Sequence, residues 1–269
     1  MRAVRMVAIG VLLVAFLIVG IPVQLVLRQV SRDADEWIPA LLCRLLLAIL
    51  RVRVDASAGA AAAEPGRLLV ANHVSWIDVL ALRSIEPLSS TAKQEVGTWP
   101  GVGTFARMQR TIFIDRRRTR QLLRVNREMA AQFGQGRSVL LFPEGTTHDG
   151  IRRGRFLTSH LGCLAEVLRH EPDRRTVPLQ AAGIAYSDPA AAWLGDATLL
   201  PHVWLILSRP PIRCTVTYGA VLAVQRGQDR KALGHALAEK VEALLASTAP
   251  AGPKALRTPE ASVRQQAAR

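Results

Sequence analysis

The sequence predicts an α/β protein in which a mixed sheet is flanked by helices and preceded by an apolar N-terminal membrane segment. Short β-rich runs alternate with helical patterns from residue 67 onward, which is typical of an α/β sheet. The 269 residues are 49% apolar, enough to bury the core of one large domain and too apolar for a disordered chain. A run of 22 uncharged residues stands close to the N-terminus.

The uncharged run covers residues 6–27 and is long enough to cross the hydrocarbon core of a bilayer as a helix. A secretory signal peptide is the alternative, because Arg2 and Arg5 form a basic region before the run. The run is longer than the apolar region of a usual signal peptide, and no obvious small-x-small cleavage site precedes Arg28. We therefore expect an uncleaved membrane anchor.

A second apolar stretch at residues 37–50 contains Arg44. It is too short to span a bilayer comfortably and fits a helix in the membrane interface. The two stretches together define an anchor region over residues 1–54. Basic residues flank the long run on both sides, so the positive-inside rule gives no orientation. A single span and a hairpin of two helices in one leaflet both remain open.

The rest of the chain divides into a folded domain over residues 55–247 and a basic tail over 248–269 without apolar periodicity. A low-complexity linker at 56–66 leads out of the anchor region. Strands are expected at 67–72, 87–93, 110–115, 138–143, 177–186 and 212–219. Helices are expected at about 76–84, 119–133, 156–169 and 231–246.

Positive charge is concentrated in one part of the predicted domain. The formal net charge is +14, and residues 107–127 hold eight arginines against one acid, Asp115. Arginine suits phosphates and carboxylates, so this stretch predicts an anionic ligand or a lipid surface. Nucleic acid is not expected, because Phe113 is the only aromatic residue in the stretch. Three cysteines without a C-x-x-C pair predict neither a disulfide framework nor a zinc or other metal site.

The segment VANHVSWIDVL offers a general base. His73 stands at the end of a predicted strand, and Asp78 falls one turn into the next helix. A carboxylate that holds one ring nitrogen of a histidine leaves the other free to take a proton from a hydroxyl. The alternative is that Ser75 and Asp78 form a capping box at the helix start and that His73 is an ordinary turn residue.

Two further strand ends could bind an anion. In SVLLFPEGTTHDG a strand runs into Glu144, Gly145 and Thr146, where a glycine turn exposes backbone N–H groups and hydroxyls. In TIFIDRRRTR a strand delivers Arg116 to its carboxyl end, where ligands collect in open α/β sheets. The alternatives are a surface turn in the first case and a solvated basic helix start in the second.

Four segments taken together resemble the lysophospholipid acyltransferase family. They are NHVSWID, AKQEVGTWPGVGTFARMQRTIFIDR, LFPEGTTHDG and VPLQAAG, and their order and spacing match over residues 67–220. The resemblance implies a glycerolipid acyltransferase-like fold at a membrane. It also implies transfer of a fatty acyl group from acyl-CoA or acyl carrier protein to the hydroxyl of a lyso-lipid, with no cofactor. The expected location is the inner membrane, with the catalytic domain facing the cytoplasm.

The resemblance also implies roles for individual residues. His73 is expected to be the general base and Asp78 to orient it. Lys93 matches a family lysine that meets the acceptor phosphate. The residues expected to bind the acceptor are Lys93, Arg116, Glu144, Gly145 and Thr146. Because a thioester is already activated, such a site needs no enzyme nucleophile.

One position departs from the family pattern. Members that act on lysophosphatidate commonly read E-G-T-R, whereas Thr147 stands here in place of the arginine. The stretch at 92–118 and the later segment from Trp193 to Trp204 are more similar to the subgroup that acylates lyso-ornithine lipid, an acceptor without phosphorus. Lysophosphatidate is ranked first as the commonest acceptor of the family, with lyso-ornithine lipid as the alternative. A non-catalytic, membrane-tethered protein that binds anions or nucleic acid is a distant third.

Overall fold

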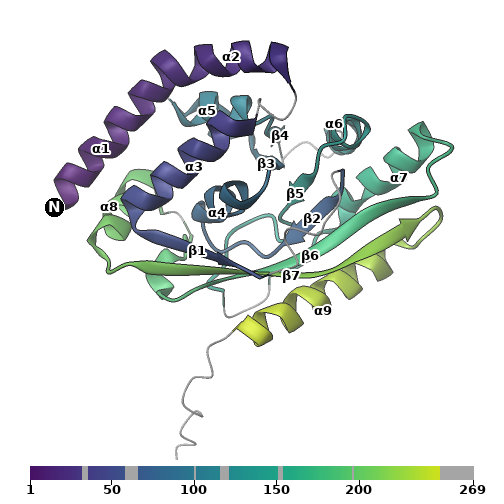
Figure 1. Cartoon of the computed structure of the whole chain (residues 1–269). Helices are drawn as coiled ribbons and strands as arrows, with labels where there is room; N and C mark the ends of the chain where they lie inside the picture. The colour runs from purple at the N-terminus through teal and green to yellow at the C-terminus, as the bar shows by residue number, and fades with distance from the viewer. Residues whose placement is uncertain are drawn as a thin grey trace, which may run out of the picture.

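The computed structural model describes residues 1–31, 36–57, 66–99, 101–115, 121–150, 154–195 and 197–248. A seven-stranded sheet in the order β1-β7-β6-β2-β5-β3-β4 forms its centre (Figure 1). The strands are β1 Val52–Ala56, β2 Leu68–Ala71, β3 Ser89–Lys93, β4 Ile112–Ile114, β5 Val139–Leu141, β6 Thr176–Tyr186 and β7 Ile212–Gln225. Only β6 and β7 pair antiparallel, so the sheet is mixed, as predicted.

Helices cover both faces of the sheet. The helices of the domain are α3 Trp37–Leu50, α4 Ile77–Ile85, α5 Val102–Met108, α6 Leu122–Gly134, α7 Gly162–His170, α8 Leu199–Ser208 and α9 Arg230–Thr248. One apolar core joins Leu69 and Ala71 of β2 to α3, α4 and α8, and the other joins Leu68 and Val70 to α6, α7 and α9. β2 therefore buries side chains on both faces, which explains its uninterrupted apolar sequence.

Every predicted strand and helix contains an element of that type, but several elements were not predicted. β1 was not predicted. It lies at the edge of the sheet, and its charged residues alternate with valines, so it lacks the apolar run that marks a buried strand. The predicted boundary between residues 54 and 55 falls inside this strand. α8 was missed because it is apolar nearly all round and carries Pro201, which hides any helical stripe. The helix predicted at 156–169 begins as a 3₁₀ turn at Thr158 and becomes α-helical only at Gly162.

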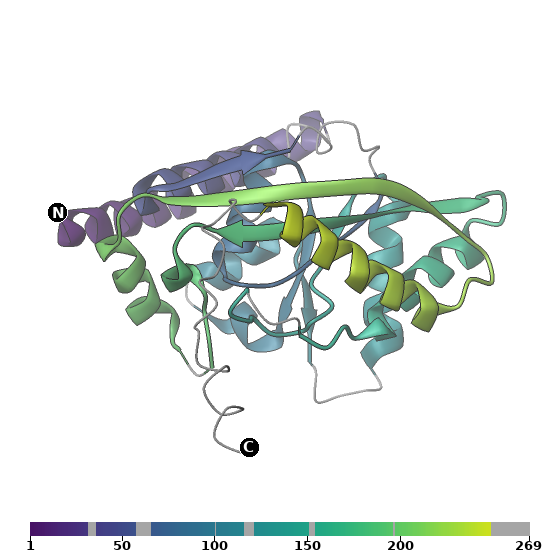
Figure 2. The same cartoon turned by 90° about the horizontal axis from the view of Figure 1, so that it is seen from below.

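The N-terminal segment forms one long helix that lies along the domain (Figures 1 and 2). Helix α1 (Arg2–Ala15), a π-helical turn at Phe16–Gly20 and α2 (Ile21–Val30) are continuous over 29 residues. Among the described residues this is the only helix long and apolar enough to cross a membrane. Yet its inner side packs against the core of the domain through Met6, Ile9, Leu12 and Phe16.

Both ends of the long helix are bonded to the domain. Near the start, the Arg5 guanidinium donates to the Ile49 carbonyl at 2.8 Å and to the Leu207 carbonyl at 2.9 Å. Near the end, Gln24 and Arg28 both donate to the Met108 carbonyl, at 3.2 and 3.0 Å. The helix is thus fastened to the ends of α3, α8 and α5 rather than standing away from the domain.

Candidate active site

The carboxyl ends of β6, β2, β5 and β3 meet at one edge of the sheet, because these four strands run parallel. Tyr186 ends β6, and Lys93 ends β3. His73 follows the end of β2 by two residues, and Glu144 follows the end of β5 by three. Segments far apart in the sequence therefore deliver their polar side chains to the same place.

His73 and Asp78 form a hydrogen-bonded pair. Nδ1 of His73 lies 2.8 Å from Oδ2 of Asp78, and the aspartate side chain is fully buried. The same oxygen accepts the backbone N–H groups of Val74 and Ser75, at 2.7 and 2.9 Å. A carboxylate oxygen has no proton to donate, so the ring nitrogen that faces it is the donor. Nδ1 therefore carries the proton, and Nε2 is left as the basic nitrogen. The His73 side chain keeps 18% of its exposure, which a substrate hydroxyl needs for access.

Tyr186 completes the environment of the aspartate, and sequence reasoning missed it. Its hydroxyl donates to Oδ1 of Asp78 at 2.6 Å. Burial, with the Asp78 charge beside it, raises the pKa of Tyr186 well above its usual value, so the hydroxyl stays protonated and donates. The only sequence signal was that Tyr186 stands at the end of a predicted strand.

The ring of His73 is also fixed by stacking. It lies on the ring of Phe142, with centroids 4.0 Å apart and planes 11° from parallel. Phe142 directly follows β5, so the strand that carries the Glu144 turn also supports the base. Rotation of the imidazole about its side-chain bonds is thereby restricted, which keeps Nε2 in one direction.

The Glu144 turn holds the backbone of His73 from both sides. Oε2 of Glu144 accepts the His73 N–H at 2.7 Å, and Oε1 accepts the Gly154 N–H at 3.2 Å. The His148 N–H donates to the His73 carbonyl at 2.8 Å. Glu144 is buried, and that burial raises the pKa of its carboxyl. Both carboxylate oxygens are therefore occupied by backbone groups of the chain itself.

The other residues expected to bind the acceptor have different surroundings. Gly145 has φ of 72°, a conformation that favours glycine, and its N–H donates to the Phe142 carbonyl within the turn. Thr146 and Lys93 are exposed at the same edge of the sheet. Arg116 lies outside the described residues. No group of three His, Cys, Asp or Glu side chains in the described part of the chain is placed to hold a metal ion.

A segment before α8 lies directly on this site. The Trp193 N–H donates to the Val74 carbonyl at 2.9 Å, and the Thr147 hydroxyl donates to the Trp193 carbonyl. Behind it, the Trp76 indole N–H donates to Nδ1 of His202 at 2.9 Å. Sequence reasoning noted this segment for its similarity alone and gave it no place in the site.

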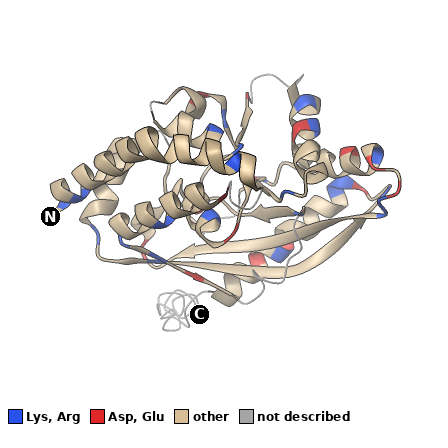
Figure 3. Cartoon of the chain, turned by 45° about the horizontal axis from the view of Figure 1, so that its top comes forward, with Lys and Arg blue, Asp and Glu red and all other residues tan. Residues whose placement is uncertain are grey.

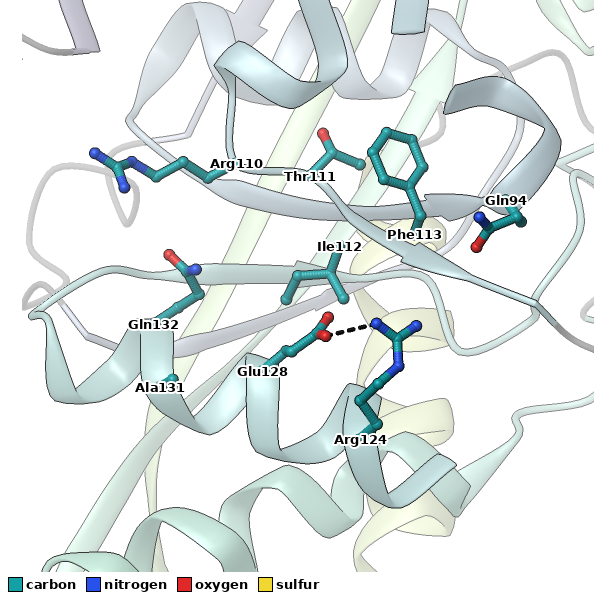
Figure 4. A pocket seen from close by; sticks show the side chains of 9 residues that line it. All are labelled: Gln94, Arg110, Thr111, Ile112, Phe113, Arg124, Glu128, Ala131 and Gln132. Carbon is teal, nitrogen blue, oxygen red and sulfur yellow. Dashed lines mark hydrogen bonds and ion pairs between the residues drawn. The ribbon is translucent and has the colours of Figure 1, made fainter. Parts of the chain in front are cut away.

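An open pocket of about 420 Å³ lies outside this constellation, between β4 and α6 at the sheet edge (Figure 4). It is lined by Arg110, Phe113 and Gln132 among others, and Arg124 forms an ion pair with Glu128 on its wall.

Helix α6 carries charges of both signs, whereas the N-terminal helix has no charged residue over most of its length (Figure 3). Part of the predicted basic stretch, residues 116–120, lies outside the described residues.

Comparison with known proteins finds similarity to acyltransferases of lysolipids. A protein-family profile described as Acyltransferase matches residues 52–182. A lyso-ornithine lipid O-acyltransferase of Rhizobium meliloti is 31% identical over 253 residues, 90% of this chain and 86% of that protein. A 1-acyl-sn-glycerol-3-phosphate acyltransferase of Neisseria meningitidis is 30% identical over 216 residues, 77% of this chain and 80% of that protein. The crystal structure of a 1-acyl-sn-glycerophosphate acyltransferase from Thermotoga maritima has the same fold, with a TM-score of 0.64 at 17% identity, over 94% of this chain and 100% of that one.

Proposed function

The chain belongs to the Acyltransferase family and acylates a lysolipid, and from this premise we propose that it transfers a fatty acyl group to the hydroxyl of lyso-ornithine lipid at a membrane surface. The family resemblance carried by the four sequence blocks is confirmed. The acyl donor is a thioester of coenzyme A or of acyl carrier protein. His73 is the general base, and Asp78 holds it.

The proposed chemistry is a direct transfer. Nε2 of His73 takes the proton of the acceptor hydroxyl while that oxygen attacks the thioester carbonyl carbon. A C–O bond forms, the C–S bond breaks, and the departing thiolate takes the proton back from the imidazolium. Asp78 stabilises the imidazolium between these steps, as a buried carboxylate on the far ring nitrogen does in other acyl transfers. A base placed in this way contributes roughly 10²–10⁴ in rate.

The hydrogen bond from His73 to the buried Asp78 is the observation that carries the proposal. His73→Ala should abolish acyl transfer in detergent micelles with either donor while leaving the protein folded by circular dichroism. His235→Ala is the matched control, because His235 is exposed on α9 away from the sheet edge. If His73→Ala kept half of the wild-type kcat/KM, the loss would be only about 0.4 kcal/mol and the base would lie elsewhere.

Lyso-ornithine lipid is proposed ahead of lysophosphatidate, which reverses the order favoured by the sequence alone. The position of the family arginine is filled by Thr147, whose hydroxyl already bonds to the Trp193 carbonyl. A phosphate dianion would therefore find no cation at this position. The similarity to the Rhizobium meliloti relative also extends over more of the chain than the similarity to the Neisseria meningitidis relative.

The acceptor is tested by competition between the two lipids in mixed micelles with one acyl donor. We expect a higher kcat/KM for lyso-ornithine lipid than for lysophosphatidate. A preference for lysophosphatidate would overturn the proposed acceptor and leave the acyl transfer standing.

We propose attachment to one leaflet of the inner membrane, with the domain in the cytoplasm, and the surface of α1 supports the attachment to lipid. Val4, Val7, Val11 and Val14 recur at helical spacing and are each more than half exposed. α1 packs beside α3 and α8, which add Leu41, Trp204 and other exposed apolar side chains. An apolar face of this kind on three adjacent helices is suited to insertion into lipid.

A further inference from the structure

The segment that carries Trp193 is hydrogen-bonded to the loop after β2 and to the loop after β5. The Trp193 N–H donates to the carbonyl of Val74, the residue after the base, and the Trp193 carbonyl accepts from the hydroxyl of Thr147. The carbonyl of the preceding residue, Ala192, lies 3.2 Å from Nε2 of the buried His202. Three bonds in two consecutive residues leave the Trp193 backbone little freedom, so its indole ring has a defined place at the site.

The indole of Trp193 forms an aromatic pair with Trp99. Their ring centroids lie 6.5 Å apart with the planes at 74°. Both side chains are half-buried. Trp99 directly follows the 3₁₀ helix Gln94–Thr98, which begins immediately after Lys93. The pair therefore joins the segment before α8, which is hydrogen-bonded to the loop of His73, to the segment that follows Lys93.

The segment of Trp99 is held as closely as that of Trp193. The Gly103 N–H of α5 donates to the Trp99 carbonyl at 2.8 Å. A Cβ added at Gly103 would lie 2.2 Å from the carbonyl oxygen of Gly97, so only glycine allows α5 to approach the 3₁₀ helix this closely. The two tryptophans thus come from separately hydrogen-bonded segments, and their rings meet edge to face at a steep angle.

We propose that Trp99 and Trp193 form a subsite for a primary alkylammonium group of the acceptor head group. This inference rests on the proposed acylation of lyso-ornithine lipid, whose head group carries an ammonium and a carboxylate. Indole faces attract ammonium ions through their quadrupole, and two faces at an angle enclose such a group better than one. Lys93, exposed at the end of β3, is the partner for the carboxylate.

Thr147 is a positioning residue for this subsite. A long cationic side chain at position 147 would repel an ammonium held at this subsite, and it would give up the bond that fixes Trp193. Threonine instead supplies a short, neutral donor to the Trp193 carbonyl. Threonine at position 147, where the family pattern has arginine, is thus explained by its hydrogen bond to the Trp193 carbonyl.

The subsite is tested by neutralising the ammonium group of the acceptor and, separately, by replacing the indole of Trp193. Lyso-ornithine lipid and its side-chain N-acetylated form, which is neutral at that nitrogen, are compared on the wild type, Trp193→Phe and Trp193→Leu. We expect N-acetylation to raise the wild-type KM roughly ten-fold. Trp193→Leu should raise the KM of the charged acceptor by a similar factor and leave that of the acetylated one nearly unchanged, and Trp193→Phe should keep most of the preference. Equal effects of Trp193→Leu on both acceptors would overturn the subsite.

Thr147 is tested with Thr147→Val, which loses the hydroxyl, and Thr147→Ser, which keeps it. Thr147→Val should reduce the preference for the charged acceptor several-fold with kcat little changed, and Thr147→Ser should restore it. Thr217→Val is the control, because it removes a hydroxyl that is bonded to Thr248 at the end of α9. A wild type that acylates lysophosphatidate but not lyso-ornithine lipid would refute the acceptor itself. A wild type that acylates both forms of lyso-ornithine lipid equally would refute only the subsite.

Discussion

Asp78 pairs with the base and forms only half of the alternative capping box, because the Ser75 hydroxyl has no partner among the described residues. Its carboxylate accepts the Ser75 N–H, as the acidic residue of a capping box does, and it also bonds to the His73 ring. One oxygen serves both purposes because His73 lies in the turn, before the helix begins. The pairing was predictable from the sequence because both residues stand at one strand-to-helix turn, with His73 in the turn and Asp78 on the helix. Tyr186 was not, because it is 108 residues from Asp78 and only the order of the strands brings it close.

Tyr186→Phe tests the hydrogen bond to the second oxygen of Asp78. The variant keeps the ring but leaves a buried carboxylate oxygen without its donor, and hydrogen bonds to charged groups contribute about 1.5–3 kcal/mol. We expect kcat to fall on the order of ten-fold with the acceptor KM unchanged, because the loss acts through the orientation of His73. Asp78→Asn should lower kcat far more than Tyr186→Phe does. A Tyr186→Phe variant with wild-type kcat would mean that the tyrosine only fills space.

Glu144→Gln separates two roles for the buried glutamate. The sequence predicts that Glu144 binds the acceptor, yet its two oxygens accept the His73 and Gly154 N–H groups. In the glutamine variant one of these N–H groups must face an NH₂, so the His73 backbone shifts. We expect kcat to fall roughly ten-fold or more while KM for the acceptor stays within about two-fold. The opposite split, a raised KM at normal kcat, would restore the role predicted from sequence.

At the scale of elements, the sequence was most informative where apolar residues form a continuous run or a regular pattern along the chain. The apolar strands at 67–72 and 138–143 were predictable, and so was the delivery of their following residues to one sheet edge. α8 was not, since its uniform apolarity matches neither a strand nor an amphipathic helix. With α8 unplaced, the segment before it could not be positioned, and Trp193 and His202 stayed without a role.

We expect His202 to make the docking of α8 sensitive to pH. It is buried, it accepts from the Trp76 indole, and burial lowers its pKa below the ordinary value of about 6.5. As the pH falls through about 6.5 the unfolded chain gains a proton that the folded chain does not, so stability is lost until the pH drops below the folded pKa. Thermal unfolding in micelles at pH 7.5 and 5.5 should show a larger fall in Tm for the wild type than for His202→Gln. Each kcal/mol corresponds to about 2–4 °C in a domain of this size. Parallel pH dependences for the two proteins would contradict this.

At the scale of the whole molecule, the predicted anchor region packs into the core of the domain instead of forming a separate unit. The predicted anchor region, residues 1–54, includes α3, whose Leu42, Cys43, Leu47 and Leu50 are almost fully buried in the core. It also includes the start of β1, which pairs with β7. Length and hydropathy could predict that the first 30 residues are apolar enough for a bilayer. They could not predict how the helix lies, because that depends on partners such as the Leu207 carbonyl, 202 residues from Arg5.

The bonds at both ends of the long helix predict that both ends lie on the same side of the membrane. A helix of 29 residues is about 43 Å long, more than enough to cross a hydrocarbon core of about 30 Å. A crossing would place Arg5 and Arg28 on opposite sides, yet each is bonded to the same domain.

Single cysteines at Ala3→Cys and Ser31→Cys test this arrangement, since both positions are exposed and the three native cysteines are buried. In sealed membrane vesicles of known orientation, an impermeant maleimide should label both positions from the face that carries the domain and neither from the other. The protein without added cysteines measures the background. Labelling of the two positions from opposite faces would establish a membrane span and refute the single-leaflet arrangement, because the bonds at Arg5 and Arg28 could not then exist together.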